Sequence, residues 1–274
     1  MGLRINTNIS AFNTTRQLNK TTGRLNKSLE RLSSGLRINR AADDAAGLAI
    51  AEAFRAQVNG LSMAQRNAQD GVSLVQTAEG ALSESHNILQ RMRELAVQAA
   101  SGTVSDTDRA AIQAEVSQLV SQLDDIASDT EFNGTKLLDG STSSISIQAG
   151  SELGQTLSVS LSGADSADLS INGSSFYVSA AAQAATAIQM IDSAILTVSS
   201  QRATLGAAQN RLDFTISTLA IQEENSAASE SAIRDANIAQ ETTEFTRNQI
   251  LISAGTSILA QANVVPQTAL QLLG

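Results

Sequence analysis

The chain has 274 residues, a formal net charge of −9 and 42% hydrophobic residues, yet only 3% of its residues are aromatic. It has no Cys, which excludes disulfides, thiol nucleophiles and thiolate metal sites. One His and the lack of HExxH, GxGxxG or phosphate-loop motifs indicate a protein that is not an enzyme and binds no cofactor.

The first predicted helix covers residues from about 5 to 34 and ends at Ser33-Ser34-Gly35. Its apolar seam comprises Leu18, Leu25, Leu29, Leu32 and Leu36. Residues 1–40 hold eight basic residues and one acidic residue, a pattern also typical of nucleic-acid or membrane-surface binders. Base stacking needs interleaved aromatic residues, which this segment lacks. We therefore expect it to pair with acidic residues near the other end, such as Glu241 and Glu244.

A second, longer helix begins near Asp43 and Asp44, whose carboxylates suit a helix N-terminus. Apolar residues then recur at every seventh position, namely Phe54, Leu61, Ala68, Val75, Leu82, Leu89 and Ala96. His86 lies one turn from Leu82 and Leu89, which favours a packing role. The pattern predicts one long helix that packs along a narrow stripe.

The third predicted helix opens with Ser105 and Asp108, which resemble a capping box. Its seam comprises Ile112, Val116, Leu119, Leu123 and Ile126. Adjacent Asp124 and Asp125 point about 100° apart on a helix, so we interpret them as solvated rather than as a metal pair. Asn133-Gly134 then predicts a tight turn.

Residues 140–178 are rich in Ser, Gly and Thr and alternate in polarity, which predicts two or three short β-hairpins. One of them would turn at Asn172-Gly173 and return through Phe176–Val178. A fourth helix from about 180 to 231 carries a seam comprising Ile188, Ile191, Ile195, Val198, Leu205, Leu212, Ile216 and Leu219. A fifth, from about 235 to 263, carries Ile238, Phe245, Ile252 and Leu259 and is expected to stop at Pro266.

These patterns predict a mainly α fold of long antiparallel helices in coiled-coil-like bundles, with a small central β-hairpin region. Each terminal helix exposes an apolar stripe that only the other end, or a neighbouring subunit, could cover. Isolated helices of this kind are marginal, so we expect the ends to be largely disordered in the monomer and to fold on assembly. No apolar run is long enough to insert into a membrane.

Several distinctive motifs follow one another along the chain: LSSGLRINRAADDAAGLAIAE (Leu32–Glu52), RNAQDGVSLVQTAEGAL (Arg66–Leu82), LQRMRELAVQAASGT (Leu89–Thr103), IQAEVSQL (Ile112–Leu119), EFNGTKLLDG (Glu131–Gly140), SQRATLGAAQNRL (Ser200–Leu212) and ILAQANVVPQTALQLL (Ile258–Leu273). These motifs resemble those of bacterial flagellin. The resemblance leaves out only residues from about 140 to 185, where flagellins differ in length. The matching motifs cover both ends of the chain and follow one another in the same order as in flagellins.

The resemblance implies a structural subunit of the bacterial flagellar filament, a helical homopolymer that acts as the propeller for swimming. Such a subunit is exported unfolded by the flagellar type III apparatus, so its location would be extracellular. Residues 1–43 with 234–274 would form the inner tube, and residues 44–233 an outer helical domain with hairpins at about 140–178. The short middle leaves no room for a large outer domain.

The resemblance also implies site residues and partners. Inner-tube and subunit–subunit packing would use Leu18, Leu25, Leu29, Leu32, Leu36, Phe245, Ile252 and Leu259. The outer-domain helix seam would use Phe54, Leu61, Leu82, Leu89, Ile112, Leu119, Ile195, Leu205 and Leu212. Gln90, Arg91, Leu95 and Glu115 resemble a patch recognised by Toll-like receptor 5. Beyond copies of itself, the implied partners are an export chaperone and the filament cap.

Two other interpretations remain open from the sequence. The hook–filament junction protein shares the terminal helices and is the nearest alternative. A membrane-active or nucleic-acid-binding helical protein would instead use the basic residues 1–40.

Overall fold

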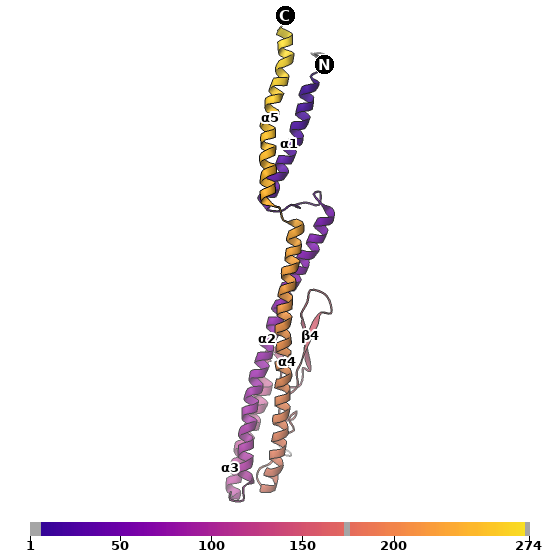
Figure 1. Ribbon diagram of the computed structural model, residues 1–274. Helices are drawn as coiled ribbons and strands as arrows, with labels where there is room; N and C mark the ends of the chain where they lie inside the picture. Colours follow the sequence, from indigo (N-terminus) through magenta and orange to yellow (C-terminus); the bar gives the residue numbers. More distant parts are fainter. Residues whose placement is uncertain (1–6, 173–175, 272–274) are drawn as a thin grey trace. The chain divides into compact units, whose positions relative to one another are not determined.

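The computed structural model describes residues 7–172 and 176–271, which form long helices with two small hairpins between the third and the fourth (Figure 1). The helices are α1 (Ile9–Ser34), α2 (Ala45–Ala100), α3 (Asp106–Asp129), α4 (Ala181–Arg234) and α5 (Ile238–Gln271). The strands are β1 (Glu131–Phe132), β2 (Thr135–Lys136), β3 (Ser144–Gln148) and β4 (Thr156–Ser160). The predicted mainly α fold is confirmed.

Local sequence explains where three of the helices begin. The Oδ1 of Asn8 accepts from the backbone N of Ala11 at 3.1 Å and starts α1. Asp44 precedes α2, and its Oδ1 accepts from the backbone N of Gly47 at 2.9 Å. At α3 the Oγ of Ser105 accepts from the backbone N of Asp108 at 3.2 Å. These polar groups satisfy amides that have no partner within the first helical turn.

The chain divides into two compact units. Unit 1 comprises Met1–Val58 and Glu224–Gly274, and unit 2 comprises Asn59–Glu223. Both boundaries lie inside helices, α2 and α4.

Unit 1 contains α1 and α5, which run side by side in opposite directions (Figure 1). α1 ends where Gly35 takes a left-handed conformation, φ +72°, and its N donates to the carbonyl of Arg31 at 2.8 Å. Beyond it, Leu36 forms an antiparallel bridge with Asp235. This bridge joins the segment after α1 to the segment before α5.

Unit 2 holds the main hydrophobic core. Buried residues of α2 recur at three- and four-residue steps and include Leu61, Ala68, Val75, Leu82, Leu89 and Ala96. On α4 the buried positions include Ile191, Val198, Leu205, Leu212 and Leu219. Ion pairs flank the α2–α4 contact, with Arg93 Nε 2.6 Å from Asp192 Oδ1 and Arg202 Nη2 3.6 Å from Glu79 Oε1. The sevenfold patterns therefore correspond to packed helix seams.

The first hairpin joins β1 to β2 through the turn predicted at Asn133-Gly134. Both residues have positive φ, 49° and 78°, as a tight two-residue hairpin turn requires. The second hairpin joins β3 to β4, with Ile145 paired to Val159 and Ile147 to Leu157. It lies against α2, where a Cβ added at Gly60 would approach Ser151 Cβ to 2.9 Å.

The structure corrects the prediction for the rest of the middle region. Residues 140–172 and 176–178 contain one hairpin rather than two or three, and Phe176–Val178 forms no strand. The expected turn at Asn172-Gly173 lies partly outside the described residues. Helix side chains satisfy backbone groups here in place of a strand partner. Gln113 Oε1 accepts from the N of Val178 at 2.6 Å, and Gln201 Nε2 donates to the carbonyl of Gly163 at 3.0 Å.

Asp124 also differs from its predicted role as a solvated residue. Its Oδ1 accepts from the backbone N of Ser166 at 2.7 Å, and its Oδ2 from the Ser166 hydroxyl at 3.0 Å. It thus anchors the segment after β4 to α3.

The end of α5 differs as well. The helix continues through Pro266 to Gln271, instead of stopping at the proline. No helix within residues 7–172 and 176–271 has the length and hydropathy needed to cross a bilayer.

Candidate assembly surface

The contact between α1 and α5 is a seam of alternating large and small residues. On α1 the half-buried or buried positions include Thr14, Leu18, Thr21, Leu25, Ser28 and Leu32. On α5 they include Glu241, Phe245, Asn248, Ile252, Gly255, Leu259 and Ala262. Both sets advance by steps of three and four residues, which places each set on one face of its helix.

The register follows from Leu18, whose Cδ1 would lie 3.0 Å from a Cβ built at Gly255. Because the helices are antiparallel, seven residues forward on α1 and seven back on α5 bring Leu25 to the level of Asn248. The same register places Thr21 opposite Ile252. A large residue thus meets a small or polar one at each level, and Cα atoms of the two helices approach within 8 Å.

Large apolar side chains also lie on the outward faces of these helices. Those exposed on α1 are Ile9, Phe12 and Leu29, and those on α5 are Ile238, Ile250, Leu251, Ile258 and Val264. Phe12 is 69% exposed and Ile250 is 62% exposed. So much apolar surface on a pair of helices is typical of an interface with other chains.

Polar contacts join the segment that follows α1 to the segment that precedes α5. The backbone N of Arg37 donates to the carbonyl of Arg234 at 2.6 Å, and the N of Ala236 donates to the carbonyl of Gly35 at 2.8 Å. Arg234 Nη1 lies 2.9 Å from Glu52 Oε1. These bonds secure the segments that enter and leave α1 and α5.

Asp43 is a carboxylate that contacts both a lysine of α1 and the backbone before α2. Its Oδ1 lies 2.6 Å from Lys27 Nζ. Its Oδ2 accepts from the backbone N of Asn39 at 3.3 Å and of Arg40 at 3.2 Å. The hydrogen bond from Lys27, with these backbone bonds and the Lys27 charge, lowers the pKa of Asp43 to about 2, although partial burial opposes the shift. The carboxylate therefore stays ionised at all but strongly acidic pH.

The predicted inner-tube residues divide into two groups. Leu18, Leu25, Leu32, Phe245, Ile252 and Leu259 are half-buried in the α1–α5 seam. Leu29 lies on another face and is exposed, and Leu36 lies beyond α1 in the bridge to Asp235. Thr21, Ser28 and Asn248 were not predicted, although they are buried in or beside the seam. Their three- and four-residue spacing from the leucines was the available signal.

Eight of the nine predicted outer-domain residues lie in or beside packed cores. Leu82, Leu89, Ile112, Leu205 and Leu212 are buried in the main core of unit 2, with Leu119 and Ile195 packed against it. Leu61 belongs to a smaller cluster with Ala64 and Leu219. Phe54 is half-buried and belongs to unit 1.

The four residues that resemble a receptor patch are not equally accessible. Arg91 pairs with Glu115 at 2.9 Å, and this hydrogen bond, with a second to Glu94, raises the pKa of Arg91. Gln90 is exposed, and its Nε2 lies 2.8 Å from His86 Nε2. Leu95 is only 3% exposed and lies in the core. A partner could therefore reach three of the four side chains directly.

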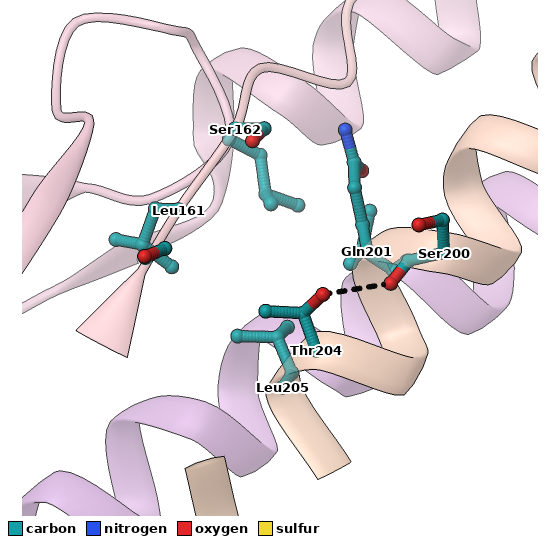
Figure 2. Close-up of a pocket in the computed structure, with 9 residues that line it drawn as sticks. Leu161, Ser162, Ser200, Gln201, Thr204 and Leu205 are labelled. Atoms are coloured by element: carbon teal, nitrogen blue, oxygen red, sulfur yellow. Dashed lines mark hydrogen bonds between the residues drawn. The ribbon is translucent and has the colours of Figure 1, made fainter. Parts of the chain in front are cut away.

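A partly open hollow of about 130 Å³ lies between α4, α2 and the segment after β4 (Figure 2). Its lining is Leu82, Leu138, Ser160, Leu161, Ser162, Ser200, Gln201, Thr204 and Leu205. The Thr204 hydroxyl is bonded within α4 to the Ser200 carbonyl at 3.0 Å. None of the lining side chains is an ordinary acid or base. Within residues 7–172 and 176–271, no three acidic or His side chains gather as metal ligands.

Family models match both ends of the chain. The model for the bacterial flagellin N-terminal helical region matches residues 5–143, and that for the C-terminal helical region matches residues 188–273. The chain belongs to the bacterial flagellin family.

Relatives in the flagellin family match along nearly their whole length. Flagellin of Bacillus subtilis (strain 168) is 47% identical over 303 residues, covering 99% of this chain and 100% of the relative. Flagellin of Halalkalibacterium halodurans is 47% identical and covers 98% of this chain and 99% of the relative. The flagellar filament 31.3 kDa core protein of Treponema maltophilum is 44% identical, with 98% and 99% coverage.

Solved structures agree with this assignment. The crystal structure of Bacillus cereus flagellin is 37% identical, with a TM-score of 0.51, and covers 56% of this chain and 88% of that one. A putative flagellar hook-associated protein from Vibrio parahaemolyticus has a TM-score of 0.59 over 70% of this chain and 100% of its own. Since its identity is 14%, it shows a shared fold only.

Flagellins are structural proteins, so this chain is a structural subunit of the extracellular flagellar filament and not an enzyme. The hook–filament junction alternative is not favoured, because the relatives that match the whole chain are flagellins and filament core proteins.

Proposed function

We propose that the chain polymerises through the two helices at its ends, and that residues 1–43 with 234–274 form the inner tube of the filament. Residues 44–233 would form the surrounding layer. The observation that carries this proposal is the apolar outward face of α1 and α5, which includes Phe12 and Ile250. Burying one such side chain completely contributes about 1.5–3 kcal/mol, so several per subunit stabilise a polymer.

The seam between α1 and α5 leaves the outward faces available to neighbours. If the outward face of α5 packs on a different surface of the next copy, the contact is heterologous, and it repeats without closing when the rotation between copies does not return to the first copy. Such a contact produces a helical polymer rather than a closed dimer. The mechanical role would follow from alternative packing arrangements of the long helices, which packed interfaces allow.

Ion pairs between basic and acidic side chains would help to fix the register of this apolar contact. Within one chain, Arg31 Nη1 lies 3.6 Å from Glu241 Oε2 and joins α1 to α5. Lys20 and Arg24 make no ion pair within the described part of the chain. They would face acidic residues of neighbouring copies, as the opposite charges of the two chain ends suggest.

Export and capping would use the same ends before assembly. The unassembled helices α1 and α5 carry apolar stripes that an export chaperone and the filament cap could cover. The lack of Cys means that no disulfide has to open before the chain is exported unfolded.

A host receptor could use the outer domain. Gln90, Arg91 and Glu115 would form the accessible part of a surface for Toll-like receptor 5, with Leu95 holding α2 in place beneath them. Arg91→Ala should then lower signalling in receptor-bearing reporter cells, whereas Arg93→Ala should not, because Arg93 pairs with Asp192 on α4. Equal signalling by the two variants would contradict the patch.

The proposal is tested first by removing residues 235–274. The truncated chain should form no filaments by electron microscopy, while circular dichroism still shows the helices of unit 2. Normal filaments from this truncation would contradict the role of the ends.

A matched pair of point variants tests the outward face itself. Ile250→Asp places a charge in the exposed apolar face of α5, and Gln249→Asp places the same charge at an exposed polar neighbour. We expect Ile250→Asp to abolish filaments and Gln249→Asp to keep them. If both polymerise equally, this face is not the interface.

A further inference from the structure

Asn8 makes two different hydrogen bonds with the two ends of its side-chain amide. Its Oδ1 accepts from the backbone N of Ala11 at 3.1 Å and caps the N-terminus of α1. Its Nδ2 donates to the carbonyl of Ala262 on α5 at 2.8 Å. One side chain therefore caps its own helix and bonds to the backbone of the antiparallel partner.

The carbonyl that Asn8 reaches has a special place in α5. In an α-helix the carbonyl of residue 262 would accept from the N–H of residue 266. Residue 266 is Pro, the only proline in the chain, and it has no N–H to donate. Asn8 thus supplies a donor to the carbonyl that the proline leaves without its helical partner.

The apolar seam alone leaves the register of α1 against α5 weakly determined. A slip of seven residues would move Leu18 from Gly255 to the level of Asn248 or Ala262, which again sets a large residue against a smaller one. Coiled coils commonly fix their register with a single polar residue, because slipped pairings leave its hydrogen bonds unmade. The Asn8–Ala262 bond is a contact of this kind. A slip that moves Leu18 to the level of Asn248 would bring Asn8 to the level of Gly255, whose carbonyl is already bonded within α5.

We propose that Asn8 is the register-setting residue of the terminal helix pair, and that it acts by bonding the carbonyl opened by Pro266. The inference rests on the proposed role of this pair in polymerisation. Asn8 and Pro266 lie at opposite ends of the chain. Together they would favour the observed register of α1 against α5 over a slipped one.

Substitutions can separate the two roles of Asn8. Ser and Asp are both good N-caps, so Asn8→Ser and Asn8→Asp keep the cap of α1. Ser is too short to reach Ala262, and Asp offers no donor. Asn19→Ser is the matched control, because Asn19 is an exposed asparagine on the same helix.

A register readout distinguishes this role from a merely stabilising one. The chain has no Cys, so two introduced cysteines give an unambiguous disulfide. Thr14→Cys with Leu259→Cys reports the observed register, and Thr14→Cys with Ile252→Cys reports a seven-residue slip. In filaments with Asn8, the first pair should cross-link within one chain and the second should not. Asn8→Ser should increase cross-linking of the second pair, and Asn19→Ser should not.

The critical concentration for polymerisation supplies the second measurement. Asn8→Ser should raise it by about 3- to 10-fold, as the loss of one net hydrogen bond implies. Pro266→Ala restores an N–H for Ala262, so Asn8→Ser should have a smaller effect in that background. Additive effects of the two changes and an unchanged cross-link pattern would overturn the inference while leaving the proposed function intact. Failure of the unsubstituted chain to form filaments would overturn both.

Discussion

Leu18 of α1 packs onto the bare backbone of Gly255 in α5, where a Cβ would lie 3.0 Å from its Cδ1. Gly in a helix interior costs about 1 kcal/mol relative to Ala. Its presence here follows from the close approach of the two helices, whose Cα atoms come within 8 Å. The pair formed by the two chain ends therefore depends on a small residue facing a large one.

We predict that Gly255→Val weakens pairing of the chain ends. The branched side chain would enter the space that Leu18 occupies, and overpacking of this kind costs about 1–3 kcal/mol. Filaments of this variant should dissociate at lower temperature, as followed by light scattering. Gly23→Val is the control, because nothing lies within 4 Å of a Cβ at that position on α1. Equal destabilisation by the two changes would show that helix propensity, and not the seam, is responsible.

We predict an acid-sensitive contribution from Asp43. Its pKa is lowered in the folded chain to about 2 from 3.8, chiefly by the bond from Lys27. A lowered pKa means that folding favours the carboxylate, so the contribution is present above about pH 4 and disappears as the pH falls toward about 2. In assembled filaments, the midpoint of urea unfolding of unit 1 should thus differ between the native chain and Asp43→Asn at about pH 5, and the difference should vanish below about pH 2.

The pH prediction has a control in Asp213→Asn. Asp213 is exposed on α4 and makes no ion pair within the described residues. Added salt should shrink the Asp43 effect, because Lys27 is half-exposed and exposed charges are screened. A difference that persists unchanged below about pH 2 would rule out ionisation of Asp43 as the cause.

Much of the helical fold could be predicted because heptad spacing survives even where polar residues interrupt it. Leu82, Leu89, Leu205 and Leu212 recur at sevenfold spacing and are buried. The Asn133-Gly134 turn was predictable too, since few sequences favour two successive positive φ values. Local chemistry sufficed for these features.

The remainder depended on contacts between residues distant in sequence. α5 continues past Pro266, and Asn8, far away in the chain, bonds the carbonyl that the proline leaves open. Val178 uses the side chain of Gln113 in place of a strand partner. Thr21 and Ser28 are buried although their side chains are polar, because the helix approach demands small residues. Sequence periodicity identifies the packed face of a helix, but it does not reveal how large the facing residues of the partner helix are.

We predict that Arg109 is a major stabilising residue of unit 2. Its Nε donates to the carbonyl of Ala99 at 2.9 Å and its Nη2 to that of Ser101 at 3.0 Å, which caps the end of α2. Arg109→Gln should lower the free energy of unfolding by about 2–3 kcal/mol, since two charge-assisted hydrogen bonds to backbone carbonyls are lost, one of them buried. Urea denaturation followed by circular dichroism measures this. Arg211→Gln, at an exposed arginine of α4, should change it by less than about 0.5 kcal/mol.

The final prediction concerns the packing of the β3–β4 hairpin against Gly71 of α2. A Cβ at Gly71 would overlap the Cδ1 of Ile147 and lie 3.5 Å from the Cδ1 of Leu212. Ile147 is buried, so its Cδ1 has little room to move aside. Gly71→Ala should therefore destabilise unit 2 by about 1–3 kcal/mol, even though Ala is the better helix former. Gly80→Ala on the same helix meets nothing within 4 Å and should instead stabilise by up to about 1 kcal/mol.

A second substitution shows whether Ile147 is the obstacle. Ile147→Val removes the Cδ1 that a side chain at position 71 would meet, so it should cost less in the Gly71→Ala background than alone. Thermal unfolding of the four chains completes the double-mutant cycle. If the two changes add without coupling, the hairpin does not rest on Gly71, and the glycine would have to be explained by some other feature of α2.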